Sequence, residues 1–219
     1  MITDRGGEQS EYRGKRIIAR DTPINGRTYV CVSEDSHGGE IVEATMVDDK
    51  SDKELDKAYK LLRDRLGEKT TLEKKRVGEL VRVVNQVTKE VMPNSDHDRI
   101  SAEFADKSHR GEPVSLGEYV EKGLGLDRHR ALLAGYLLER LKDDEYIHPW
   151  GISIDRNYVP DKGDHAWVRY VNRAGEVFVI DPMFGFAGRL DDSNRPNWPY
   201  ERDEDKKTAG VLVKQATGQ

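Results

Sequence analysis

The 219-residue sequence contains a single cysteine, Cys31, and no long apolar run. One cysteine excludes an internal disulfide bond, which fits a reducing compartment. No stretch of about 18 apolar residues is present, so we expect no membrane-spanning helix and no membrane partner. The N-terminal segment also lacks the apolar region of a signal peptide, which predicts a cytoplasmic protein. Secretion by a route that needs no N-terminal signal stays open.

A concentrated block of positive charge is also missing. Lysine and arginine number 36 against 41 acidic residues, which gives a net charge of -5. Phosphate contacts need a basic face, so we expect no nucleic-acid partner. The scattered histidines lack zinc-ligand spacing, so neither a metal site nor a cofactor is expected; they are His37, His97, His109, His129 and His148. The sequence leaves the oligomeric state undetermined.

Polar ends flank one predicted domain. Residues 1–12 and 200–219 are rich in Gly, Glu, Asp and Lys and are predicted to be disordered tails. The length between them, residues 13–199, suits a single domain with a sizeable core. We expect three parts within it: a β meander in 13–48, helices in 51–92, and a core that carries the sequence motifs in 114–188.

Local patterns support each part. Asn25-Gly26 is a hairpin-type turn signal between strand-like runs, which favours the meander. Ser51 and Glu54 form a predicted capping box for a helix that ends at Gly67. A second helix carries an apolar stripe from Val77 to Val91. Residues 93–113 are predicted to be a loop.

The motif-bearing core combines a helix with strands. Residues 127–142 have a broad apolar face, which is typical of a buried helix. Residues 150–159, 166–171 and 176–180 have strand patterns, and a turn at 172–175 joins the last two. A buried helix packed on an antiparallel sheet predicts an α+β fold.

The last two of these strands bring His165 close to Asp181. With a loop at 172–175, His165 lies opposite Pro182, and a three- or five-residue loop sets it opposite Asp181. A carboxylate that accepts one imidazole N–H leaves the other ring nitrogen as a base. The alternative is a histidine near a strand end by chance and an aspartate that serves a turn.

Asp127 is expected at the start of the buried helix, where unpaired N–H groups and the helix dipole would activate a cysteine as thiolate. Aspartate is also a good N-cap, so capping alone explains it. Cys31 lies in a strand-like run, Tyr29–Val32, and is expected to be buried and unreactive.

Three segments together resemble the transglutaminase-like, papain-type superfamily: GLGLDRHRALLAGYLLERL, DHAWVRY and VFVIDPMFG. The similarity is to the branch found in bacterial proteins and in the regulatory regions of plant Raf-like kinases, and it covers roughly residues 114–188. The resemblance implies that His165 is the catalytic base and Asp181 its orienting partner. It also implies that Arg128, His129 and Arg130 pack and hydrogen-bond around the substrate cleft, with no defined role, and that Trp167 lines this cleft or its core.

The departure from this family lies at the nucleophile. The family's cysteine aligns with Asp127, completing the expected site of Asp127, His165 and Asp181. A carboxylate is a poor nucleophile toward amides, because its acyl product would be an anhydride. Two functions stay open: an inactive or altered module that binds a protein or peptide side chain in the former cleft, and a nucleophile-substituted variant of an active transglutaminase, deamidase or peptidase. An acid–base pair or a cation site at Asp127 is a further alternative.

Overall fold

The computed structural model describes residues 11–12, 15–17, 28–34, 41–48, 51–67, 77–192, 199–203 and 205. For residues up to 43, and for residue 158, it describes the backbone alone. The Asn25-Gly26 turn, the side chain of Cys31 and most of both predicted tails therefore lie outside what is described.

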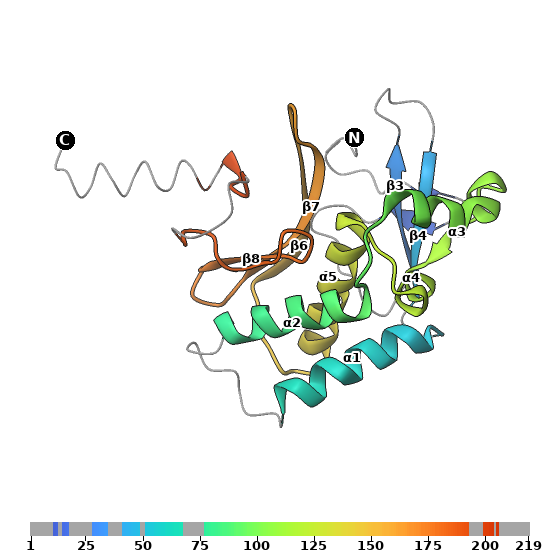
Figure 1. Cartoon of the computed structure of the whole chain (residues 1–219). Coiled ribbons are helices and arrows are strands. Elements are labelled where there is room, and N and C mark those ends of the chain that lie inside the picture. The colour runs from blue at the N-terminus through green and yellow to red at the C-terminus, as the bar shows by residue number, and fades with distance from the viewer. Residues whose placement is uncertain are drawn as a thin grey trace.

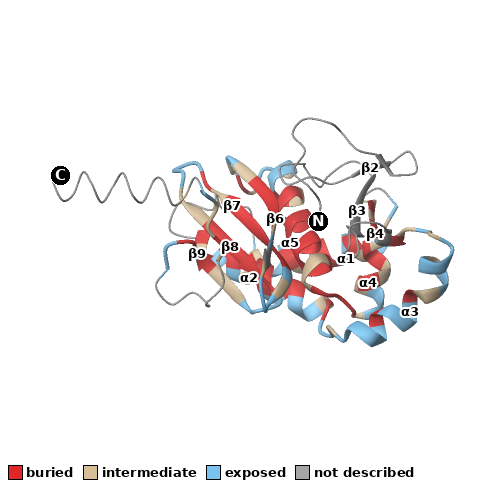
Figure 2. Cartoon of the chain, turned by 90° about the horizontal axis from the view of Figure 1, so that it is seen from above, coloured by how far each residue is buried: buried red, intermediate tan, exposed pale blue. Residues whose placement is uncertain are grey.

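Two sheets lie on opposite sides of the molecule, with helices between them, so the fold is α+β (Figures 1 and 2). The first sheet has the order β1-β2-β3-β4-β5. Its strands are β1 (Glu11–Tyr12), β2 (Lys15–Ile17), β3 (Thr28–Glu34), β4 (Ile41–Asp48) and β5 (Val114–Ser115). The second sheet has the order β6-β7-β8-β9 and is antiparallel throughout. Its strands are β6 (Gly151–Val159), β7 (Gly163–Val171), β8 (Val177–Asp181) and β9 (Phe186–Arg189).

The N-terminal strands do not form the predicted meander. β3 and β4 form an antiparallel pair, but β2 pairs with β3 in parallel, with Arg16 opposite Tyr29. Parallel neighbours need a crossover, which a two-residue hairpin turn cannot supply. The strand positions were therefore predicted better than their connection.

Five helices follow the first four strands in the described part of the chain. They are α1 (Lys53–Leu66), α2 (Val77–Val91), α3 (His97–His109), α4 (Leu116–Lys122) and α5 (Asp127–Asp143). Gly67 ends α1 as predicted, with a φ of 73° and its N–H bonded to the carbonyl of Arg63. The N-cap of α1 is Asp52 rather than Ser51, because its carboxylate accepts from the N–H groups of Glu54 and Leu55. None of the described helices is both long and apolar enough to cross a membrane.

Helix α3 corrects the loop predicted for residues 93–113. Its sequence is polar on most sides, and only Ile100 and Phe104 are buried. Two apolar residues give too weak a periodic signal to predict a helix. Asp96 caps its N-terminus by accepting from the N–H of Arg99 at 3.0 Å.

Helix α5 occupies the centre of the core, as its broad apolar face predicted. Twelve of its 17 residues are buried, and it contacts β6, β7 and β8 of the second sheet as well as α1, α2 and α4. Figure 2 shows this helix buried along most of its length. A helix held on several sides fixes the position of its first turn, where Asp127 lies.

The C-terminal tail was predicted to begin at residue 200, but the structure places residues 199–203 and 205 against the second sheet. Tyr200 is fully buried, and two arginine–aspartate pairs fasten this segment. Arg202 binds both carboxylate oxygens of Asp155 at 2.6 and 2.8 Å. Arg169 binds both oxygens of Asp205 at 2.6 and 2.8 Å. Bidentate ion pairs of this kind are strong and directional. They therefore hold the segment on the sheet, although its polar composition predicted a disordered tail.

Candidate functional site

The loop between α4 and α5, which leads to Asp127, is held by its own backbone turn and by contacts with Met92 and Asn94. Gly123 ends α4 in the left-handed conformation, with a φ of 64°. Gly125 passes so close to Met92 that an added Cβ would lie 2.7 Å from its sulfur. The backbone of this loop also bonds to Asn94, whose N–H donates to the carbonyl of Gly123 at 3.1 Å. These contacts give the first turn of α5 one defined starting position.

Asp127 is the first helical residue of α5, and Leu126 is its N-cap. The carboxylate oxygen Oδ2 of Asp127 accepts a hydrogen bond from the N–H of Ala166 on β7 at 2.8 Å. The same oxygen lies 3.4 Å from Nδ1 of His165. Capping alone therefore does not account for this residue, because its side chain also joins the helix to the neighbouring strand.

His165 lies between two carboxylates. Its Nε2 is 2.6 Å from Oδ2 of Asp181, on the side of the ring opposite Asp127. The predicted juxtaposition of Asp127, His165 and Asp181 is confirmed, and we call these three residues the carboxylate–imidazole cluster. Their catalytic role stays a prediction.

The strand register differs from the one that the sequence predicted. β7 and β8 are joined by five residues, with Val171 opposite Val177, and their ladder ends at Val168 and Ile180. If this register continued beyond the end of the ladder, His165 would lie opposite Met183 rather than opposite Pro182 or Asp181. The side chains of His165 and Asp181 still meet, because β7 extends beyond its ladder with β8 and Asp181 is the last residue of β8.

Asp181 is held by three hydrogen bonds. Besides the bond to His165, Oδ1 accepts from the N–H of Phe184 at 2.9 Å, and Oδ2 accepts from the hydroxyl of Tyr200 at 2.8 Å. Asp181 is completely buried, so these partners replace the water that a carboxylate needs. Sequence reasoning missed Tyr200 because it assigned residue 200 to a tail. Two aromatic residues at the boundary of that predicted tail, Trp198 and Tyr200, were the available signal.

The two carboxylates control the charge of His165. Burial by itself would lower the pKa of His165, but hydrogen bonds and charge interactions with Asp127 and Asp181 raise it to about 9. Burial would raise the pKa of Asp127, but the hydrogen bond and charge of His165 outweigh it and hold that pKa below its ordinary value. At neutral pH the cluster therefore holds an imidazolium between two carboxylates.

Arg130 supplies a further positive charge beside the cluster. It is 5% exposed, and its Nη1 lies 3.7 Å from the sulfur of Met183. Burial lowers the pKa of Arg130 and the charge of Asp127 partly opposes this effect, so the guanidinium stays protonated. With Arg130 included, two positive charges balance the two carboxylates.

An exposed apolar pair borders the cluster at the turn between β8 and β9. Phe184 is 52% exposed, and its ring lies 4.4 Å from the imidazole of His165. The adjacent Met183 is 36% exposed. His165 itself is 4% exposed, whereas the side chain of Asp127 is 19% exposed. A ligand can therefore reach the cluster at the edge formed by Asp127 and this apolar pair.

The residues that the resemblance places along a cleft lie in different surroundings. His129 is buried, stacks on Tyr119 at 4.0 Å, and its Nδ1 accepts from the N–H of Leu126 at 3.1 Å, so it caps α5 rather than lining a cleft. Trp167 is also buried, on the face of the second sheet that contacts Tyr200. Arg128 is partly exposed, and its charge helps to lower the pKa of Asp127.

Among the described residues, no group of three His, Cys, Asp or Glu side chains is placed to hold a metal ion. The cluster has two carboxylates, but its imidazole lies between them and binds both. No family model, curated protein or solved structure matches this chain.

Proposed function

We propose that this chain is a transglutaminase-like domain without a nucleophile, which binds a protein or peptide segment over the former active site and does not turn it over. The observation that carries this proposal is that both ring nitrogens of His165 face carboxylate oxygens. A general base needs a free nitrogen lone pair directed at the attacking group. The imidazolium between Asp127 and Asp181 has none at neutral pH.

The chemistry at Asp127 supports the same conclusion. Its Oδ2 is engaged by the N–H of Ala166 and lies beside the imidazolium of His165. Both interactions withdraw charge from the carboxylate and weaken an already poor nucleophile. In a thiol enzyme these same donors would stabilise the thiolate and the developing oxyanion. Here they hold a permanent negative charge instead.

The surface around the cluster supports binding of a peptide. Phe184 and Met183 expose apolar area, and Phe184 lies against the imidazole of His165, whose Nδ1 faces the partly exposed carboxylate of Asp127. Aromatic residues and methionine are enriched at protein interfaces relative to the rest of the surface. Three hydrogen bonds fix Asp181 and the end of β8, so this surface is largely preformed.

A panned random-peptide library tests the binding directly. We expect enriched peptides that bind the immobilised chain and lose most of their affinity for Phe184→Ser. The matched control is Trp150→Ser, because Trp150 is 74% exposed and precedes β6 near the far end of β7 from His165. Equal loss in both variants, or no enriched peptide at all, would contradict the proposed binding site.

Turnover is tested with the unmodified chain. We expect no amine incorporation into a glutamine-containing protein and no peptide cleavage. Alkylation of Cys31 should leave peptide binding unchanged. Activity that is abolished by Cys31→Ser, with the fold intact by circular dichroism, would overturn the proposal.

One observation favours the second candidate, an active thiol enzyme represented by a nucleophile-substituted variant. The pairing of His165 Nε2 with Asp181 leaves Nδ1 facing residue 127 at the start of α5. This is the orientation in which a base would activate a cysteine at that position. Acyl transfer by Asp127→Cys would support this candidate.

A further inference from the structure

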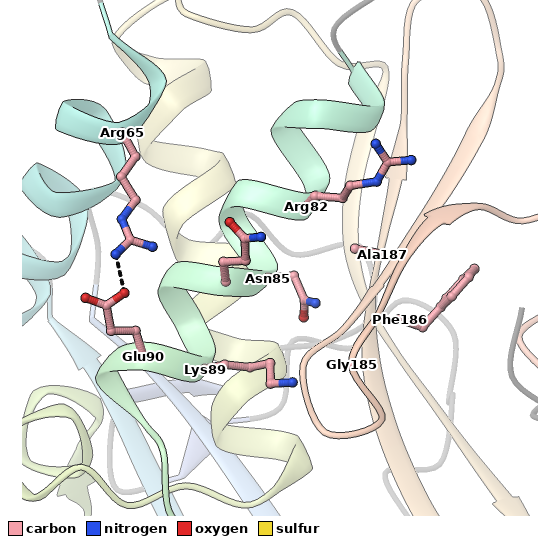
Figure 3. Close-up of a pocket in the computed structure, with 9 residues that line it drawn as sticks. Arg65, Arg82, Asn85, Lys89, Glu90, Gly185, Phe186 and Ala187 are labelled. Atoms are coloured by element: carbon pink, nitrogen blue, oxygen red, sulfur yellow. Dashed lines mark hydrogen bonds and ion pairs between the residues drawn. The ribbon is translucent and has the colours of Figure 1, made fainter.

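A groove lies between α2 and the turn that links β8 to β9. Its volume is about 750 Å³, which is within the range of ligand-binding pockets. Its walls come from the end of α1, one face of α2 and the start of β9 (Figure 3). The lining residues are Arg65, Arg82, Asn85, Gln86, Lys89, Glu90, Gly185, Phe186 and Ala187, and we call this cavity the α2 groove.

The charge of the α2 groove is predominantly positive, with three cations and one carboxylate among its lining residues. Glu90 forms an ion pair with Arg65, which joins α2 to the end of α1 (Figure 3). Arg82 and Lys89 form no ion pair with any residue that the structure describes. They lie on α2 seven positions apart, so they project from the same face of the helix. This face presents two cations to the groove.

Asn85 provides an independent indication of a ligand. It lies between Arg82 and Lys89 on α2, lines the groove and is 7% exposed. Its Oδ1 is buried and accepts no hydrogen bond from the described residues. An unpaired buried acceptor is destabilising, and such groups call for an explanation. The rest of the carboxamide lines the groove, where it can form a hydrogen bond with a ligand.

The turn between β8 and β9 connects the α2 groove to the cluster. On one side Phe184 covers the ring of His165 at 4.4 Å. On the other side Lys89 approaches Gly185 so closely that an added Cβ would lie 3.2 Å from its Nζ. A chain that contacts Phe184 and continues past Gly185 therefore enters the groove. β9 is the last strand of the described sheet, so its outer edge suits an extended segment.

We propose that the α2 groove binds an acidic segment of the peptide whose apolar residues contact Met183 and Phe184. This inference rests on the proposed function and names the class of its ligand. Arg82 and Lys89 bind the carboxylates, and the carboxamide of Asn85 forms a hydrogen bond with the peptide backbone. A peptide meets these requirements together, because it carries acidic groups, N–H donors and apolar side chains along one extended chain.

The test is a titration of the ¹⁵N-labelled full chain with two acetylated, amidated peptides, Glu-Leu-Glu-Leu-Glu and Gln-Leu-Gln-Leu-Gln. Signals of Lys89, Gly185 and the Asn85 side-chain amide report on the groove, and those of His165 and Phe184 report on the cluster. We expect the glutamate peptide to shift both sets and to bind more tightly than the glutamine peptide. Added salt should weaken this difference, because exposed charges are screened.

Charge-neutralising variants locate the binding. Arg82→Gln and Lys89→Gln should each weaken binding of the glutamate peptide by about two- to fivefold, as expected for exposed ion pairs. The controls are Arg99→Gln and Lys60→Gln, which remove exposed cations of the same types from α3 and α1 without touching the groove lining. Melting temperatures close to that of the parent chain confirm that the four variants fold.

The outcomes separate this inference from the proposed function. Equal binding of both peptides, binding of inorganic phosphate with no preference for the glutamate peptide, or insensitivity to the Arg82 and Lys89 variants would overturn the acidic-peptide site. If only the cluster signals shift, the proposed function stands and this inference fails. If only the groove signals shift, and only with the glutamate peptide, the groove binds its acidic segment but the former active site does not take part.

Discussion

Nε2 of His165 and Oδ2 of Asp181 lie 2.6 Å apart, in a position where both residues are almost completely closed to solvent. The ring's other nitrogen faces Asp127 at 3.4 Å. The same His–Asp pair would orient a catalytic base if residue 127 were neutral or a thiol. With a second carboxylate in that place, the pair becomes part of a charged structural cluster.

The protonated state of His165 should make stability depend on pH. Its pKa is raised from about 6.5 in the unfolded chain to about 9 in the fold. Protonated His165 therefore contributes on the order of 3 kcal/mol to the free energy of unfolding. This contribution is present in full below about pH 6.5 and is lost as pH rises toward about 9. Urea denaturation at pH 6, 7.5 and 9 measures it. His165→Gln should remove this loss, and an unchanged pH dependence in that variant would contradict the prediction.

Asp127→Cys should create a reactive thiol. A cysteine at the first turn of α5, facing an imidazole held by Asp181, has its thiolate stabilised by both features, so its pKa should fall below the free value of about 8.5. In a Cys31→Ser background it should react with iodoacetamide near pH 7 much faster than Cys31 does in the parent chain. Adding His165→Ala should slow the reaction. A rate profile like that of an ordinary cysteine, with or without His165, would show that the cluster does not activate this position.

Tyr200→Phe should destabilise the fold and alter the cluster. The hydroxyl donates to the buried carboxylate of Asp181 at 2.8 Å, and a hydrogen bond to a charged group contributes about 1.5–3 kcal/mol. Without this donor the carboxylate interacts more strongly with His165, so the pKa of His165 should rise further. NMR titration of the imidazole measures this shift.

The matched control for Tyr200 is Tyr170→Phe. Tyr170 is a buried tyrosine of β7, and burial raises its pKa to about 12. No hydrogen bond joins its hydroxyl to the residues that the structure describes. We expect a smaller loss of stability and no change in the pKa of His165. Equal effects of the two substitutions would contradict the assigned role of Tyr200.

Arg202→Ala should release the segment that carries Tyr200. The guanidinium binds Asp155, which is 2% exposed, so its loss leaves a buried carboxylate without this partner. Breaking such a pair costs about 3 kcal/mol or more. Chemical denaturation measures the cost, and Arg110→Ala, which removes an exposed partner of Glu112, should cause no measurable change. Adding Asp155→Leu should recover part of the loss, and no recovery would show that the buried charge is not its source.

Local signals in the sequence predicted much of the fold around the site. Ser115 and Glu118 form the capping box that starts α4, and both of its hydrogen bonds lie within four residues of the chain. The breadth of the apolar face of residues 127–142 predicted the buried helix α5. These features depend on neighbours in the chain, so the order of residue types is enough to reveal them.

Relationships between distant segments were harder to predict. The parallel pairing of β2 with β3 and the weakly amphipathic helix α3 differ from the patterns that their sequences favour. Strand pairing depends on contacts across the sheet, and a polar helix is stabilised mainly by what it packs against. Neither influence is visible within a short window of sequence.

The sequence by itself determined the chemical types in the cluster, the α+β class and the start of α5 at Asp127. Only the tertiary structure decided that both nitrogens of His165 face carboxylates and that Tyr200 returns to bind Asp181. The reason is that these groups lie up to 73 residues apart, from 127 to 200. The packing of α5 on β7 sets their distances, together with the ion pairs that fasten residues 199–203 and 205.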